Sequence, residues 1–242
     1  MRHARPLRLA GLAGDVLDLL HPRRCVGCGL LGRPLCLECS RSLAREPFRH
    51  RPSGLPGSVP CLYAAAAYDG IARTAILEWK ERANRDLCRP LAHALAAAVA
   101  FGMADLGVDA PVAIVPVPAS NVAVRARGED VLGRMARLAA RDLTQQGHDA
   151  RPQKLLSLMR TPRDQAALGT LARRENLAGA MRARSRRAAD ASTVVVLVDD
   201  VATTGATLTE ASRALTSAGW TPGLAATIAA TSRKVYGDDR GQ

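Results

Sequence analysis

The segment VVVLVDDVATTGATL, residues 194–208, joins an apolar run to two adjacent acids and then to a loop of small and hydroxyl residues. The apolar run predicts a buried strand. Within the loop, Gly205 accepts unusual backbone angles, and Thr203, Thr204 and Thr207 add hydroxyl groups. A loop that opens a helix offers unpaired N–H groups and the positive end of the helix dipole, so residues 202–207 are suited to binding a phosphate.

The acid pair, Asp199 and Asp200, would repel a bare phosphate. Ionised carboxylates only accept hydrogen bonds, so they suit a ligand that carries neutral vicinal hydroxyls beside its phosphate. A sugar phosphate meets both requirements. The alternative is a surface loop with solvated acids and threonines that serve the turn, although such a loop rarely combines an acid pair, a Gly loop and a capping box. The segment is neither a Walker loop nor a dinucleotide-binding loop.

Four cysteines form a second cluster in CVGCGLLGRPLCLEC, where two CxxC pairs stand seven residues apart. The candidate metal ligands are Cys25, Cys28, Cys36 and Cys39. Each pair can present two thiolates from a tight turn, and four thiolates close the coordination shell of a structural Zn²⁺. Disulfides and a redox dithiol are the alternatives, but no secretory signal is evident, and a redox CxxC would stand singly beside a βαβ unit. The isolated Cys61 and Cys88 are expected to be packing residues.

The net charge of +12 predicts an anionic partner, which could be phosphate, nucleic acid or a membrane surface. Two tryptophans, three tyrosines and two phenylalanines are too few for a platform on which successive bases stack. The start of the chain reads as a short amphipathic helix rather than a signal peptide, because Asp15 and Asp18 interrupt its apolar part. The apolar residues 91–106 are shorter than the roughly 20 that a membrane span needs. We therefore expect a cytoplasmic protein without membrane insertion.

Helices and strands must position these groups, and the sequence pattern predicts that the chain has two parts. The segment HRPSGLPGSVP, residues 50–60, reads as a linker between an N-terminal part, 1–59, with a helix and zinc ribbon, and a main domain, 60–242. In the main domain, periodicity predicts helices over 71–79, 91–103 and 129–145, and strands over 110–118, 193–198 and 223–231.

The helix after the acid pair is predicted from Thr207 to about residue 218, because Thr207 and Glu210 have the spacing of a capping box and Gly219 follows. Strand, loop, helix and strand in this order predict a right-handed βαβ unit on a parallel sheet. Ligands bind such sheets at the carboxyl ends of their strands, which is where residues 199–207 fall. The fold class predicted is therefore α/β.

On these residues, the chain resembles a type I phosphoribosyltransferase and is similar in particular to the ComF (competence protein F-like) family, which carries an N-terminal zinc ribbon. The resemblance covers nearly the whole chain. It rests on residues 194–208, the CxxC pairs, the YDG and LEWKER segments from Tyr68, VPVP at 115–118, and the spaced residues Gln165, Leu168, Arg173 and Asn176.

The resemblance implies a parallel sheet flanked by helices and a site for phosphoribosyl pyrophosphate (PRPP), or a similar ribose phosphate, bound with Mg²⁺. It makes Asp199 and Asp200 the catalytic acids, which hold the 2′- and 3′-hydroxyls of the ribose. The loop that would wrap the 5′-phosphate consists of Ala202, Thr203, Thr204, Gly205, Ala206 and Thr207. The implied reaction is the displacement of pyrophosphate from ribose C1 by an acceptor, with no side-chain nucleophile.

The same resemblance places a pyrophosphate loop in VPASNVAVRARGED, with Arg125 and Arg127 as candidates, helped by Lys80. Arg173 and Asn176 would lie in a segment that covers the site. Solvated basic residues are the alternative for this arginine-rich chain. The chain departs from similar proteins at Glu129-Asp130, where they usually have an aromatic residue and Asn, and two acids there would weaken anion binding unless Mg²⁺ bridges them or they point away.

Two classes of function remain open at this point. The first is an enzyme that transfers phosphoribosyl to an acceptor that the sequence does not name, in DNA uptake (competence) or nucleotide metabolism. The second is a non-catalytic accessory protein that binds PRPP or single-stranded DNA, alongside DNA-uptake or repair proteins. Residues 1–60 carry ten Lys or Arg against four Asp or Glu, an excess that suits phosphate backbones.

Overall fold

A computed structural model of the chain describes residues 23–52, 56, 59–82, 84–119, 124–125, 128–160, 175–188 and 192–231. The strands are β1 (Phe48–His50), β2 (Cys61–Ala67), β3 (Val112–Pro116), β4 (Ala150–Pro152), β5 (Leu156–Leu158), β6 (Met181–Ala183), β7 (Val194–Ala202) and β8 (Pro222–Ala230). Six of them form one sheet in the order β1-β2-β8-β7-β3-β4, parallel except for the β1–β2 pair. Strands β5 and β6 form a separate antiparallel pair.

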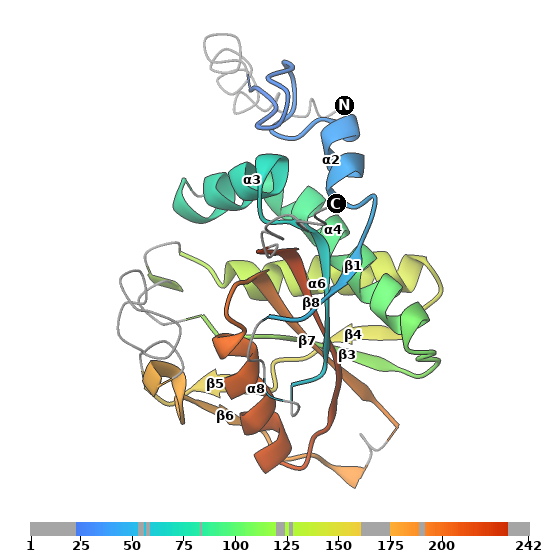
Figure 1. Ribbon diagram of the computed structural model, residues 1–242, viewed down its shortest axis with the longest axis vertical. Helices are drawn as coiled ribbons and strands as arrows, with labels where there is room; N and C mark the ends of the chain where they lie inside the picture. The colour runs from blue at the N-terminus through green and yellow to red at the C-terminus, as the bar shows by residue number, and fades with distance from the viewer. Residues whose placement is uncertain are drawn as a thin grey trace, which may run out of the picture.

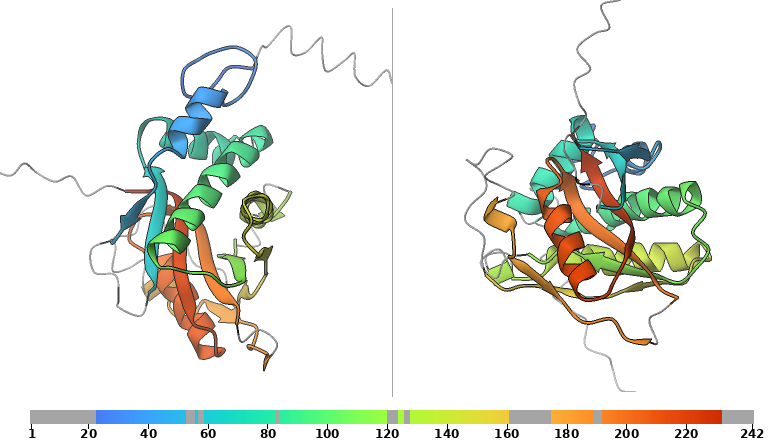
Figure 2. Two further views of the ribbon diagram at one scale, coloured as in Figure 1. Left: turned by 90° about the vertical axis from the view of Figure 1, so that its right-hand side faces the viewer. Right: turned by 60° about the horizontal axis from the view of Figure 1, so that its bottom comes forward.

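Helices cover both faces of the large sheet. They are α2 (Leu37–Leu43), α3 (Gly70–Glu81), α4 (Cys88–Asp105), α6 (Val131–Gln145) and α8 (Ala206–Ser217), with a 3-10 turn, η1 (Arg85–Leu87), before α4. Helices α4 and α6 lie on one face and α8 on the other (Figures 1 and 2). The predicted α/β architecture, a mostly parallel sheet flanked by helices with a cysteine cluster near the N-terminus, is confirmed.

The two central strands explain why their sequences are apolar without alternation. Residues 195–198 of β7 and 224–226 of β8 are fully buried, because helices cover both faces of the sheet at its centre. The strand predicted at 110–118 is shorter, ending at Pro116, and the strand predicted at 193–198 is longer, ending at Ala202. Proline has no N–H for a strand ladder, which accounts for the first difference.

Helix α4 is the longest described helix and belongs to the core. Together with the turn before it, Arg85–Asp105 is long and apolar enough to cross a membrane by length and composition, so the argument from a short apolar run is wrong. However, 61% of its most apolar window is buried inside the protein, as in the core helix of a soluble fold. At Gly102 an added Cβ would lie 2.6 Å from the ring of Tyr63, so the glycine permits the close approach of α4 to β2.

The N-terminal part contacts the sheet through β1, which precedes the predicted boundary at residue 60 and pairs antiparallel with β2. Helix α2, next to the cysteine cluster, leads into this strand (Figure 1). The helix predicted at the start of the chain lies outside the described residues.

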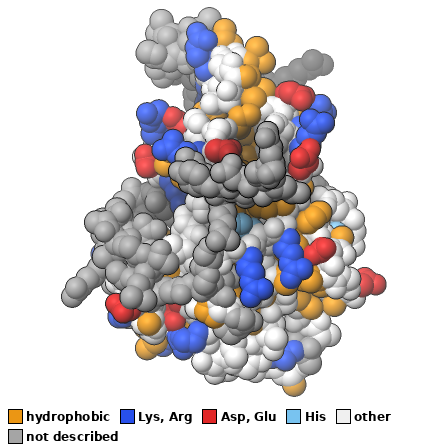
Figure 3. Space-filling model, viewed as in Figure 1, with side chains coloured by type: hydrophobic (Ala, Val, Ile, Leu, Met, Phe, Trp, Pro, Cys, Tyr) orange, Lys and Arg blue, Asp and Glu red, His pale blue; other side chains and the backbone are white. Residues whose placement is uncertain are grey.

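Basic side chains on the face shown in Figure 3 are interspersed with acidic ones, rather than gathered into one patch, over the part that the described residues form. The positive net charge is therefore not concentrated there. Oppositely charged side chains also pair in the described structure, as Arg82 does with Glu78 and Arg151 with Asp149.

Candidate functional site

The acid pair lies within the carboxyl-terminal end of β7, rather than beyond it. Val201 and Ala202 still pair with Ala229 and Ala230 of β8, which extends the strand past Asp199 and Asp200. Residues before and after the acids along β7 pair with β8, which fixes the backbone that carries the acids. Their side chains therefore project from a rigid element at the edge where parallel sheets bind ligands.

Asp199 is partly buried and has an unusual proton affinity. Burial, followed by the charge of Asp200, raises the pKa of Asp199 to about 7, although Lys80 and the backbone N–H of Asp200 act in the opposite direction. The backbone N–H of Asp200 donates to Asp199 Oδ1 at 2.8 Å. Near neutral pH, Asp199 therefore exchanges between a carboxylate, which only accepts hydrogen bonds, and an acid, which can also donate one.

Lys80, which is predicted to contact pyrophosphate, lies at the acid pair. Its Nζ lies 2.6 Å from Asp200 Oδ2, and the two side chains are 30% and 17% exposed. Lys80 stands in the last turn of α3, where a cation interacts favourably with the helix dipole. The adjacent Trp79 is only 2% exposed and anchors that turn in the core.

The loop after β7 turns directly into α8. Gly205 is the residue before the helix and has φ of 70°, a left-handed conformation that favours glycine. Thr204 Oγ1 accepts a hydrogen bond from the Ala206 N–H at 3.4 Å. Asp199 and residues 201–208 line a small pocket, so the first N–H groups of α8, which lack partners within the helix, face the same hollow as the acid.

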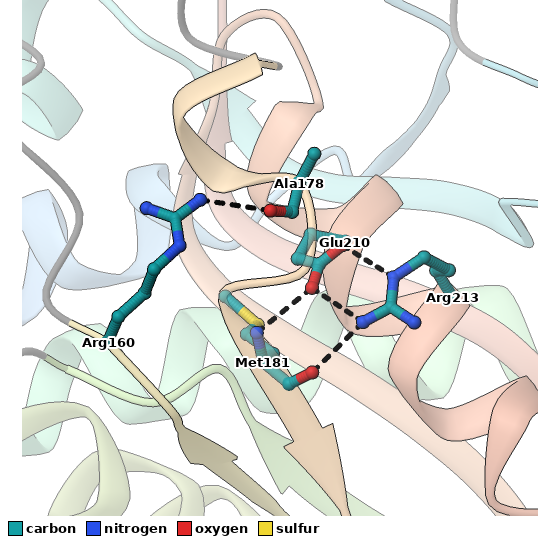
Figure 4. Close-up of polar contacts among 5 residues, drawn as sticks. All are labelled: Arg160, Ala178, Met181, Glu210 and Arg213. Carbon is teal, nitrogen blue, oxygen red and sulfur yellow. Dashed lines mark hydrogen bonds and ion pairs between the residues drawn. The ribbon is translucent and has the colours of Figure 1, made fainter.

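The predicted capping box is wrong, although α8 begins within one residue of its predicted start. Glu210 does not return to the start of the helix. Its carboxylate is 4% exposed and accepts hydrogen bonds from the Met181 N–H at 2.9 Å and from Arg213 at 2.7 and 2.8 Å (Figure 4). Burial alone would raise the pKa of Glu210, but the hydrogen bonds from Arg213 and Met181 outweigh it and lower the pKa.

These contacts fasten α8 to the small β5–β6 sheet. Arg213 also donates to the Met181 carbonyl at 3.0 Å. Glu210 and Arg213 therefore bond to each other and to the N–H and carbonyl groups of Met181. Nearby, Arg160 donates to the Ala178 carbonyl at 2.9 Å (Figure 4). Sequence reasoning missed this cluster. The available pattern was a Glu and an Arg three residues apart on a helix face.

The loops after β3 and β7 start side by side. Pro116 pairs with Val198, and the Val117 N–H donates to the Val198 carbonyl at 3.0 Å, so the chain that follows β3 begins next to Asp199. From there β3 leads to α6 on one face and β7 leads to α8 on the other (Figure 2). Connections that run to opposite faces from neighbouring strands create the crevice in which open α/β sheets bind ligands.

Glu129 and Asp130, the two acids that interrupt the expected pyrophosphate loop, form ion pairs or hydrogen bonds with other groups of the protein. Asp130 is the residue before α6 and accepts from the Gly133 N–H at 3.0 Å, which makes it a helix cap. Glu129 pairs with Arg85 at 3.1 Å and with Arg134 at 3.4 Å. Both charges are therefore partly neutralised, which reduces the repulsion that they would exert on an anion.

The remaining predicted site residues are only partly described. Arg125 is exposed and Asn176 is partly buried. Arg127 and Arg173 lie outside the described residues, as do Gln165 and Leu168.

The four cysteines of the cluster come together as their spacing predicts. Their sulfur atoms all lie within 4.8 Å of one another, and Cys28 Sγ lies 3.7 Å from Cys36 Sγ. The edge of a tetrahedron with Zn–S distances of about 2.3 Å is about 3.8 Å, whereas a disulfide would bring the sulfurs to about 2.05 Å. Burial and the neighbouring sulfurs raise the pKa of Cys39, whereas backbone hydrogen bonds lower the pKa of Cys25 to about 6 despite its burial. The donor set therefore fits a structural zinc ion.

The other two cysteines behave as separate residues. Cys88 is 2% exposed in the core, as expected. Cys61 is partly buried in β2 and accepts a hydrogen bond from Arg49 at 2.9 Å.

A pocket of about 560 Å³ lies elsewhere in the described part of the chain. It is formed by α2, the start of α4 and the end of α6, and it shares no lining residue with the pocket at the acid pair. At its edge the buried Asp142 contacts Arg89 at 3.4 Å and His93 at 3.3 Å.

No protein-family model matches the chain, and a search of curated proteins finds no match.

Proposed function

We propose that the chain is a ComF-like type I phosphoribosyltransferase, which binds PRPP with Mg²⁺ and transfers its phosphoribosyl group to an acceptor. The single observation that carries this proposal is the position of Asp199 and Asp200 at the carboxyl end of β7, directly before a hydroxyl-rich loop that opens α8. Phosphorylated ribose presents both a phosphate for the loop and two vicinal hydroxyls for the acids.

The loop and the acids divide the ligand between them. The 5′-phosphate would lie at the start of α8, where backbone N–H groups and the threonine hydroxyls donate hydrogen bonds. Gly205 has no side chain, so the backbone can approach the phosphate closely, and as a glycine it also accepts the left-handed conformation found there. The 2′- and 3′-hydroxyls would donate to Asp199 and Asp200. Neutral hydroxyls, unlike a phosphate, are not repelled by the two carboxylates.

The reaction needs no covalent enzyme intermediate. A lone pair on the acceptor nitrogen forms a bond to ribose C1 while the bond from C1 to the pyrophosphate oxygen breaks, and the electron pair leaves with pyrophosphate. The proton carried by that nitrogen is then released to solvent. The acids fix the ribose while its ring becomes positively charged, and their negative charge stabilises that state. Mg²⁺ bound with pyrophosphate would supply charge neutralisation on the leaving group.

The test combines calorimetry with PRPP and Mg²⁺ and an assay of pyrophosphate release across a panel of purine, pyrimidine and other amine acceptors. We expect binding, release with at least one acceptor, and loss of release in Asp200→Asn. Asp149→Asn is the matched control, because Asp149 is an exposed acid paired only with Arg151 in the described structure. Wild-type protein that fails to bind PRPP would contradict the proposal.

A second candidate is a non-catalytic accessory protein that binds PRPP or single-stranded DNA. The excess of basic residues in 1–60 and the cysteine cluster within the same segment favour it. DNA affinity that falls steeply with salt, together with PRPP binding but no turnover on any acceptor, would support this candidate. DNA affinity that is independent of salt would exclude phosphate-backbone binding.

A further inference from the structure

The pocket of about 560 Å³ lies where the N-terminal part of the chain meets the main domain. Residues between 33 and 40 supply one wall, and the first turns of α4 and the last turn of α6 supply the others. A pocket of this volume suits a small molecule, and such sites are common where two parts of a protein meet. It shares no lining residue with the pocket at Asp199, so the two are separate sites.

Asp142 is a buried charge that lines this pocket. Its side chain is 7% exposed, and it stands in the last turn of α6, near the negative end of the helix dipole. Burial and the dipole both disfavour a carboxylate at this position. An acid that lowers stability where it stands is typical of a binding site rather than of a packing position.

The contacts of Asp142 in the described structure leave it able to accept further hydrogen bonds. Its Oδ1 lies 3.4 Å from Arg89 Nη2, and its Oδ2 lies 3.3 Å from His93 Nδ1. Charge-assisted N–H···O bonds are usually about 2.7–2.9 Å, and a carboxylate offers about four acceptor positions. Arg89 and His93 are 63% and 55% exposed, so water can solvate both of them. Asp142 therefore has acceptor positions for a ligand.

The charges around Asp142 favour a neutral donor. A cationic ligand would meet Arg33 and Arg89, and an anionic ligand would meet the carboxylate itself. A neutral ligand avoids both repulsions, and two adjacent N–H groups match the two oxygens of a carboxylate. Guanine carries such a pair, N1–H and the 2-amino group, on one edge. Adenine and cytosine have a ring acceptor beside their amino group, and that acceptor would face the carboxylate.

The rest of the lining suits a flat ring with polar edges. Leu35, Leu37 and Pro90 offer apolar contacts for the faces of the ring, and the amides of Gln145 and Gln146 offer both donors and acceptors for its other edges. We propose that this pocket binds a guanine nucleoside, whose N1–H and 2-amino groups donate to Asp142. This site goes beyond the proposed function and does not depend on it.

The first experiment is calorimetry of the full-length wild type with guanosine, inosine and adenosine. Guanosine should bind. Inosine, which lacks the 2-amino group, should bind about tenfold more weakly, because one hydrogen bond to a charged acceptor is lost. Adenosine should bind more weakly still. Absence of guanosine binding, or equal affinities for guanosine and adenosine, would overturn the proposal.

The second experiment measures guanosine affinity and thermal unfolding of Asp142→Asn. The affinity should fall at least about tenfold, because the amide replaces one acceptor oxygen by a donor. The unfolding temperature should not fall, since the substitution removes an acid that burial and the helix dipole disfavour. A merely structural Asp142 would give the reverse: a lower unfolding temperature and unchanged guanosine affinity.

Two control variants separate this pocket from other sites. Asp149→Asn alters an exposed acid outside the pocket and should keep the guanosine affinity. Asp200→Asn should also keep it, and loss of guanosine binding in this variant alone would place the nucleoside at the acid pair and refute a second site. Guanosine binding at Asp142 in a protein that fails to bind PRPP would overturn the proposed function and leave this inference intact.

Discussion

Asp199 accepts a hydrogen bond from the backbone N–H of Asp200, its own neighbour in β7, at 2.8 Å. That bond favours the ionised form of Asp199, yet burial and the charge of Asp200 outweigh it and bring the pKa to about 7. The acid pair is therefore electrostatically strained without a ligand, as groups at functional sites commonly are.

PRPP affinity should rise with pH, since ribose hydroxyls need a carboxylate that accepts. Between pH 6 and pH 8 the ionised fraction of a group with pKa about 7 increases roughly tenfold, and the affinity should follow it. Calorimetry across this range measures the effect. Asp199→Asn should flatten the profile apart from the titration of the phosphates of PRPP, and an identical slope in both proteins would rule out Asp199 as the source.

Asp199→Asn should also stabilise the free protein above neutral pH. The folded pKa, about 7, lies above the ordinary aspartate value of 3.8, so the folded state keeps a proton that the unfolded chain releases. Stability therefore declines as pH rises from about 4 to about 7 and stays reduced above that range. Asn has no such loss, and we expect a gain of about 1–3 kcal/mol at pH 8 that vanishes near pH 4, measured by urea unfolding.

Zinc should be bound at one ion per chain and be needed for the fold of the cysteine cluster. Cys39→Ser should lose the metal, because a tetrahedral site with three thiolates is open and much weaker. Cys61→Ser, which alters a cysteine outside the cluster, should retain it. Elemental analysis of the purified variants gives the answer, and a zinc content equal in all three proteins would contradict the assignment.

The Glu210–Arg213 pair should respond unequally to loss of either partner. Arg213→Met leaves a buried carboxylate without its cation and with only backbone N–H donors, and it should destabilise the protein by about 3–5 kcal/mol. Glu210→Gln keeps an acceptor for both donors and should cost about 1–2 kcal/mol. Thermal unfolding of both variants compares the two costs. Equal losses would mean that the cluster acts by shape rather than by charge.

Gly205→Ala should weaken PRPP binding and cost about 1–2 kcal/mol of stability, because the residue has φ of 70°. Gly107 has φ of 62° with nothing within 4 Å of an added Cβ, so Gly107→Ala carries a similar strain away from the site. The control should lose stability but keep its PRPP affinity. Equal affinity losses in both variants would show that strain, not the loop, is responsible.

The sequence predicts the features that depend on neighbours in the chain. The apolar run of β7, the acids after it and the start of α8 are all local, so they could be placed within a few residues. The cysteine cluster could be predicted from the spacing of its residues, because metal coordination allows only certain spacings. The contacts that sequence reasoning missed join distant segments: Lys80 with Asp200, Glu210 with Met181, and β1 with β2. Periodicity carries no information on such pairings.

Both edges of the large sheet are only three residues long, β1 at one side and β4 at the other, and β4 ends in Pro152. Short edges and a proline give an incoming strand little backbone to pair with. The large sheet is thus guarded against growing from molecule to molecule by strand pairing at its edges.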